Sequence, residues 1–357
     1  MNAEFDTTAY LEQIFEELNF DGLESFSVDF LPGKMGFGEM VEQLLWEKSI
    51  SWSDVVAMVG QCFFYELQNA KTILIGVLFL AIGYTVFGRY LQGEKKQMND
   101  ITYLAVYGAL VLILMESFLL ISRVAAEGVE ALQQYLTALI PAYATTLALS
   151  GNLTSGACFY ELTFGILWVE EWVMADLILP AIHLMVLLAL LNHLGVGEPL
   201  GGYVGMIESA VKWGMKILTT AVVGVGSVEA LLAPARDQIA ENTVLKSLSI
   251  LPGLGGGFEF AEEVIWSCGA LVKNCVGIAG VIFLVLVGLS PIITIFAYFF
   301  LYRLLAAMLG PIADHKMIEC MFDMSRAAWL LLKVMANTIL WFLLSILMVT
   351  ASTSFMG

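Results

Sequence analysis

The sequence predicts an all-α, polytopic membrane protein, a helical bundle that follows an acidic amino-terminal region. Of its 357 residues, 59% are apolar and 14% are charged, whereas soluble domains have about 45–50% and about 25%. Uncharged apolar runs recur along the chain, and the first of them, 72–88, has 17 residues, near the lower limit for crossing a bilayer of about 30 Å. These features exclude most soluble enzymes.

The net charge of −17 is unevenly distributed, and this predicts two regions. Residues 1–70 carry thirteen acidic residues and two lysines, whereas 71–357 carry twenty acidic residues and fourteen Lys or Arg. We therefore expect an acidic extracytoplasmic region over 1–70 and a multi-pass transmembrane domain over 71–357. No basic face exists that would favour nucleic-acid binding.

The amino-terminal region is predicted to be helical and amphipathic. In 7–19, apolar residues recur at steps of three and four, which predicts a helix with one apolar face. Residues 36–68 are expected to form one or two helices that lie on a surface. Basic residues follow the first apolar run at Arg89, Lys95 and Lys96. The positive-inside rule then places 89–100 in the cytoplasm and 1–70 outside it.

Six to eight membrane spans are expected, and some of them are expected to be broken helices. The apolar segments are 72–88, 101–122, 137–168, 172–194, 207–231, 275–309 and 327–349. A polar, Gly-containing stretch at 150–156 interrupts the third segment. The segment 275–309 is too long for one span, and Pro291 near its middle favours a broken helix or a helical pair.

Prolines and glycines are the candidate hinge or packing positions. Pro180 follows Pro141 by 39 residues, and Pro291 follows Pro252 by the same interval. This spacing is compatible with chance or with internally repeated halves, which are common in transporters. Gly255 and Gly256 lie in a glycine run before three acidic residues, where close packing and a gating hinge are both open interpretations.

Ionisable or polar residues inside apolar segments are the candidate functional residues, because each needs a partner or a wet cavity in hydrocarbon. The candidates are Glu116, Asp176, Arg303, Lys333 and Asn337. They could line a polar pathway, or they could pair between helices, for example Glu116 with Lys333 or Arg303. Glu170 and Glu171 are expected to be solvated at an interface.

Signatures of catalysis and of metal binding are absent from the sequence. The three histidines lack the spacing of metal ligands, and His193 and His315 are expected at helix boundaries. The five cysteines include no CxxC pair, so neither zinc-site spacing nor a disulfide framework is expected. We assign no catalytic residue, no cofactor and no metal.

Two blocks of the sequence resemble the stage III sporulation protein AE family of spore-forming Firmicutes. One block runs from NTVLKSLSILPGLGGGFEFAEE to YRLLAAMLGPIAD over 242–314, and the other is ALIPAYATTLALSGNLTSGACFYE at 138–161. The resemblance extends over roughly 70–350 and is most specific over 240–326. Members usually begin with a cleavable signal sequence, and Met1–Glu4 shows neither its basic start nor its apolar core.

The resemblance implies a non-enzymatic membrane subunit of a sporulation channel or secretion-like complex. It would lie in the mother-cell membrane around the forespore, together with the other stage III A proteins and the stage II Q protein, and would support late forespore development. The alternative is a stand-alone secondary transporter with internally repeated halves. An intramembrane enzyme is disfavoured, because no paired catalytic constellation exists. Genomic context would separate the first two.

Overall fold

The structure is a computed structural model of the chain, and it describes residue 23 and residues 36–45, 52–91, 96–150, 153–193, 199–248, 258–311 and 313–354. Every regular element in these ranges is a helix, which confirms the all-α prediction. The elements are α3 (Phe37–Leu45), α4 (Trp52–Asn69), α5 (Lys71–Leu91), α6 (Lys96–Leu149), α7 (Leu153–Glu170), the π-helix η1 (Glu171–Ile178), α8 (Leu179–Asn192), α9 (Gly201–Leu248), α10 (Phe258–Leu309) and α11 (His315–Ser354).

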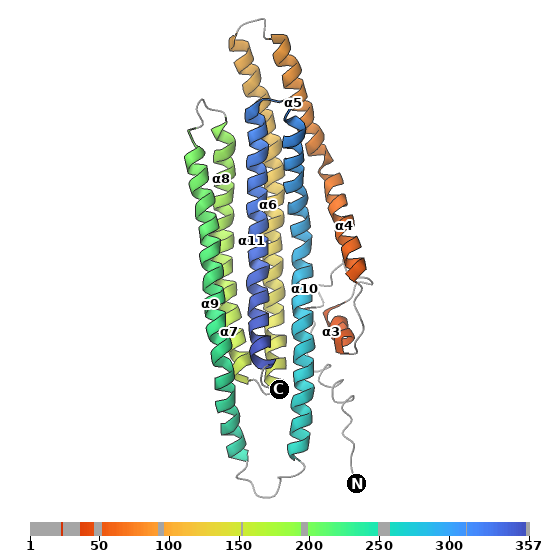
Figure 1. The fold of residues 1–357 in the computed structure, drawn as a ribbon, viewed down its shortest axis with the longest axis vertical. Helices are drawn as coiled ribbons and strands as arrows, with labels where there is room; N and C mark the ends of the chain where they lie inside the picture. Colours follow the sequence, from red (N-terminus) through yellow and green to blue (C-terminus); the bar gives the residue numbers. More distant parts are fainter. Residues whose placement is uncertain are drawn as a thin grey trace.

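The helices form an elongated bundle in which the long helices run nearly parallel to the long axis (Figure 1). The end of α5, the start of α6, the end of α8 and the start of α9 and α11 lie toward one end, whereas the end of α11 and the start of α10 lie toward the other. With 54 residues, α6 is about 80 Å long at 1.5 Å per residue. It therefore extends well beyond the hydrocarbon core of a bilayer, which is about 30 Å thick.

Five helical segments in the described ranges are long and apolar enough to cross a membrane. They are Val59–Leu80, Leu104–Ala148, Thr163–Asn192, Ala270–Leu309 and His315–Leu347. The multi-pass character is thus as predicted, although the described ranges contain fewer such segments than the six to eight expected. The expected span 207–231 lies within α9 and is not one of the five.

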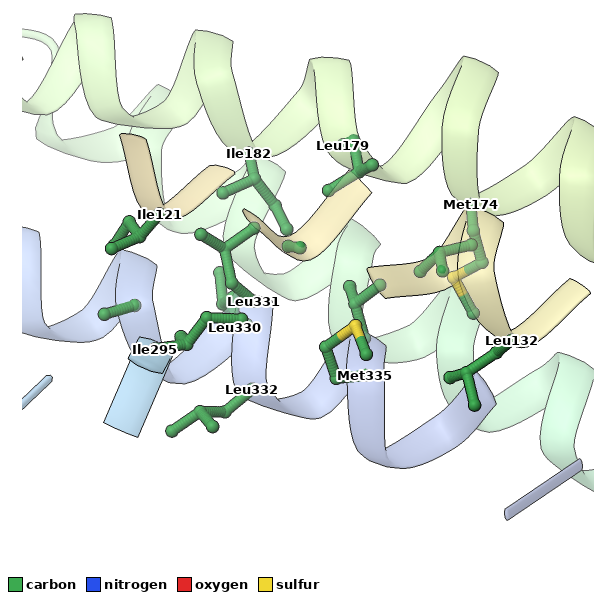
Figure 2. Packing of buried hydrophobic residues seen from close by; sticks show 14 of the residues in the cluster. Ile121, Leu132, Met174, Leu179, Ile182, Ile295, Leu330, Leu331, Leu332 and Met335 are labelled. Atoms are coloured by element: carbon green, nitrogen blue, oxygen red, sulfur yellow. The ribbon is translucent and has the colours of Figure 1, made fainter. Parts of the chain in front are cut away.

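Helix α11 is the centre of the bundle. It packs against α6, α7, α8, α9 and α10. Figure 2 shows its apolar side chains meeting those of α6, η1, α8 and α10, and all of the labelled residues are buried. They are Ile121, Leu132, Met174, Leu179, Ile182, Ile295, Leu330, Leu331, Leu332 and Met335. The exterior is also strongly apolar, as in Leu112 and Phe79, which are 73% and 77% exposed. An apolar surface of this kind is suited to lipid.

The prediction of a broken helix or helical pair over 275–309 is wrong, because α10 continues through Pro291 as one α-helix. Pro291 is buried and packs against α6 at Gly128, where an added Cβ would lie 2.8 Å from the Pro291 Cγ. Unpaired backbone groups are costly in hydrocarbon, so the rest of the hydrogen-bond ladder is retained while neighbouring helices hold the proline in place. Pro141 likewise lies inside α6.

Pro180 behaves differently, since it lies at the start of α8, directly after the π-helix η1. Pro180 and Pro291, the second proline of each pair that suggested repeated halves, therefore occupy different local structures. Of the other predicted hinge or repeat positions, Pro252, Gly255 and Gly256 lie outside the described residues.

The predicted polar break at 150–156 coincides with the boundary between two helices, and its last four residues belong to α7. Helix α6 ends at Leu149, α7 begins at Leu153, and the two helices pack on each other. The chain therefore reverses here. The predicted separate span 101–122 is part of the same uninterrupted α6.

The acidic amino-terminal region contributes two helices over the predicted 36–68, α3 and α4. Helix α3 is amphipathic, with Phe37 and Met40 buried and Glu39 exposed. The Phe37 ring lies 5.4 Å from that of Phe283 on α10, and Phe63 of α4 lies 5.7 Å from Phe296. These helices thus cover one side of α10. The face predicted over 7–19 lies outside the described residues.

Candidate functional site

The most deeply buried acidic side chain in the described bundle is Glu170, at the junction of α7 and η1. Its relative exposure is 0%, so the expectation that it is solvated is wrong. Its carboxylate accepts a hydrogen bond of 2.8 Å from the Thr338 hydroxyl on α11 and another from the Gln133 amide on α6. One carboxylate thus joins three helices. The π-helix begins at the next residue, and π-turns are frequent at functional sites.

Further polar contacts join α6 to α8, closer to the start of α6 than the contact between Gln133 and Glu170. His183 Nδ1 lies 2.8 Å from the Leu179 carbonyl, which can only accept, so Nδ1 carries a proton. In the neutral ring, Nε2 then accepts from the Ser122 hydroxyl at 2.9 Å. Tyr107 donates to the Leu190 carbonyl at 2.6 Å. Because these groups are buried between helices, their hydrogen bonds fix how α6 and α8 align.

A charged cluster links α8, α9 and α11 near the end of α8 and the start of α9 and α11. His193 Nε2 lies 2.9 Å from Asp323 Oδ2, and Asp323 also pairs with Arg326. Arg326 in turn lies 3.7 Å from Glu208 on α9, and Glu208 pairs with Lys212 at 2.6 Å. His193 is the C-cap residue of α8, which confirms its predicted position at a helix boundary.

His315, the first residue of α11, confirms the other boundary prediction. The sequence did not predict the charged cluster, because its members on α8 and α9 are more than one hundred residues from those on α11. The only local signal is the close spacing of Glu319, Asp323 and Arg326 along one face of a helix.

Three candidate residues, Glu116, Asp176 and Arg303, lie on the outside of the described bundle. Their side chains are exposed, Glu116 on α6, Asp176 on η1 and Arg303 on α10. The suggested pairing of Glu116 with Lys333 or Arg303 is not formed. The Arg303 Nε donates to the Ser325 hydroxyl at 3.1 Å, and its guanidinium faces aromatic rings.

Lys333 and Asn337, the remaining candidates, are brought together one turn apart on α11. Both border a pocket against α9 with a volume of about 300 Å³. The Lys333 ammonium lies 5.8 Å from the centre of the Trp329 ring. The Asn337 carbonyl accepts from the Thr219 hydroxyl of α9 at 3.3 Å. The sequence identified these two residues but not the lysines of α9 that complete the pocket.

Metal-type clusters do not occur in the part of the chain that the structure describes, where no three His, Cys, Asp or Glu side chains are arranged to hold an ion. The polar groups above instead connect neighbouring helices, and they leave Glu116 and Asp176 facing outward. This arrangement suits a membrane protein whose helices are held in a fixed alignment.

The sequence matches the stage III sporulation protein AE family over residues 35–353. The chain belongs to this family. It is also similar to stage III sporulation protein AE of Bacillus subtilis (strain 168), with 26% identity over 313 residues, which cover 87% of this chain and 78% of the relative. No solved structure matches the chain. The family resemblance drawn from 138–161 and 242–314 is therefore confirmed, and with it a role in sporulation.

Proposed function

We propose that the chain is a non-enzymatic membrane subunit of a transenvelope, secretion-like channel complex between mother cell and forespore. Its partners would be the other stage III A proteins and the stage II Q protein, and it would be needed for late forespore development. Family membership supports the sporulation role, and the outward-facing charges support a place in a larger assembly.

The observation that carries the proposal is the exposure of Glu116 within an apolar surface. Its exposed neighbours on α6 include Leu112 and Leu119, which are 73% and 44% exposed. Asp176 is similarly placed beside Trp172 and Leu177, both 59% exposed. Intramembrane charges almost always face a protein interior or a wet cavity. Another chain that covers these two carboxylates would meet that requirement, whereas a stand-alone transporter would enclose such groups within its own bundle.

We further propose that the chain lies in the mother-cell membrane around the forespore, with residues 1–70 outside the cytoplasm. Arg89 lies near the end of α5, and Lys96 begins α6. These helix ends lie at the same end of the bundle as the start of α11, which begins with His315 and Lys316. The positive-inside rule favours this end as cytoplasmic. Helix α4 meets α5 at the opposite end of α5.

The proposal is tested by replacing Glu116 and Asp176 with leucine, singly and together, in sporulating cells. The variants should fold normally, because neither side chain contacts the core, while recovery of the complex by pull-down and late forespore gene expression should both fall. Glu130→Leu is the matched control, since Glu130 is also exposed on α6 and its bond is to Gln134 on the same helix. Normal complex recovery and normal expression in the double variant would contradict the proposal.

A further inference from the structure

A pocket between α9 and α11 is lined by cationic side chains and by side chains that can donate hydrogen bonds. The groups that matter are Lys212, Lys216, Thr219 and Thr220 from α9, and Lys333 and Asn337 from α11. Its volume of about 300 Å³ is at the lower end of the range of about 300–1,000 Å³ for ligand pockets. The pocket therefore suits a headgroup or a small ion better than a peptide segment.

The charge of this pocket is only partly balanced. Lys212 and Lys216 are four residues apart on one face of α9, an arrangement in which the like charges repel each other. Lys212 pairs with Glu208 at 2.6 Å, but Glu208 also lies 3.7 Å from Arg326. Within the described ranges, neither Lys216 nor Lys333 takes part in an ion pair, and the residues that line the pocket include no acid. An anion is the ligand that would complete it.

The neutral groups of the pocket favour an anion with several acceptor oxygens. The Asn337 amide donates to the Met215 sulfur at 3.3 Å, and a thioether is a weak acceptor that an anionic oxygen would outcompete. The Thr219 hydroxyl is held by the Trp341 indole N–H, from which it accepts at 2.9 Å, and by the Met215 carbonyl, to which it donates at 2.9 Å. The exposed Thr220 hydroxyl donates only to the Lys216 carbonyl of its own helix, at 2.9 Å, and can turn toward a ligand. Ammonium groups bind phosphate as point charges, and charge-assisted hydrogen bonds are roughly twice as strong as neutral ones. A phosphate group offers enough oxygens to use all of these donors.

The surroundings of the pocket combine aromatic and apolar exposure with its positive charge. Trp213 and Ile217 of α9 are 66% and 58% exposed, and Trp329 of α11 is 45% exposed. These rings flank the lysines with aromatic surface, and Lys333 lies near the middle of the apolar segment His315–Leu347. Basic pockets between transmembrane helices are a recurring form of anionic lipid recognition.

We propose that the pocket between α9 and α11 binds a phosphate group, carried either by an anionic phospholipid or by free phosphate. Lys216 and Lys333 supply the charge that attracts it, and Asn337 with Thr220 supplies the directional hydrogen bonds. The site is formed by this chain alone and does not require the sporulation complex proposed above.

The test uses the purified full chain, freed of bound lipid in detergent, and follows its thermal unfolding. One arm adds phosphatidylglycerol, with phosphatidylcholine as the uncharged comparison, and the other adds inorganic phosphate, with chloride at matched ionic strength. Stabilisation by phosphatidylglycerol alone assigns the site to a lipid headgroup. Stabilisation by inorganic phosphate assigns it to the free ion.

The double variant Lys216→Gln/Lys333→Gln should bind the effective ligand about 30-fold more weakly, because each cation near an anionic lipid surface contributes about a factor of five. Lys333→Arg keeps the charge and should retain most of the affinity. Lys71→Gln is the control, since Lys71 is exposed on α5, away from the pocket. The proposal is overturned if neither phosphate source stabilises the wild type, or if the double variant unfolds normally without ligand and binds as tightly as the Lys71→Gln control.

Discussion

The contact between Gly128 of α6 and Pro291 of α10 makes a sharp prediction about helix packing. A Cβ added at Gly128 would lie 2.8 Å from the Pro291 Cγ and 2.9 Å from both the Pro291 Cβ and the Met335 Cε. Met335 can change rotamer, but the proline ring is rigid. Gly128→Ala therefore requires α6 and α10 to move apart.

The size of the effect follows from two opposing contributions. Placing an extra methyl group in a well-packed core costs about 1–3 kcal/mol. Alanine in a helix interior is about 0.5–1 kcal/mol more favourable than glycine. Gly108, also within α6, has no atom within 4 Å of an added Cβ, so Gly108→Ala receives only the second contribution. The two variants should therefore differ in unfolding free energy by about 1–3 kcal/mol.

Thermal unfolding of the purified full chain in detergent measures this difference. Gly108→Ala should raise the midpoint, and Gly128→Ala should fall below it by several degrees. Adding Pro291→Ala to Gly128→Ala should recover part of the loss, because the atoms that clash are removed and neighbouring residues couple in such cycles. If Gly128→Ala and Gly108→Ala shift the midpoint equally, the close approach of α6 and α10 at Gly128 is refuted.

Three further predictions follow. Glu170→Leu leaves the donors of Gln133 and Thr338 unpaired and should lower the free energy of unfolding by about 2–4 kcal/mol in a denaturation assay. Glu161→Leu, at an exposed position on the same helix, should change this free energy little, and equal losses in the two variants would contradict the role of Glu170 as a buried link between helices. Gly255→Val and Gly256→Val should reduce recovery of the complex by pull-down if these glycines allow close helix packing. An intact complex with lost late forespore gene expression would instead indicate that the glycines line a transport pathway. A cysteine placed at residue 20 should react with an impermeant maleimide in intact cells, and labelling only after lysis would reverse the assigned orientation.

Much of the fold was predictable from local features of the chain. The apolar runs were recognised because a bilayer requires about 20 apolar residues per span, and the amphipathic spacing in 36–68 correctly predicted helices there. The positions of His193 and His315 at helix boundaries were also predictable, because polar residues interrupt the apolar pattern at those points. Pro291 led to a wrong prediction, since its contact with Gly128 is invisible until α6 and α10 are side by side.

The candidate site was predictable only in part. Lys333 and Asn337 were identified as unusual residues in an apolar segment, but the lysines that complete their pocket lie on α9, more than one hundred residues away. Glu170 was taken for a solvated residue, because nothing near it in sequence shows that Gln133 and Thr338 will meet its carboxylate.

The sequence by itself determined the helical class, the membrane environment and the family, because these depend on composition, on the length of apolar runs and on local motifs. Only the tertiary structure decided which side of each helix is interior. A helix that is apolar all round has no polar side to distinguish its exposed face from its buried one, and packing between membrane helices depends on shape more than on hydrophobicity. Glu116 and Glu170 illustrate this, since both lie in predominantly apolar stretches of the sequence, yet one is exposed and the other is fully buried.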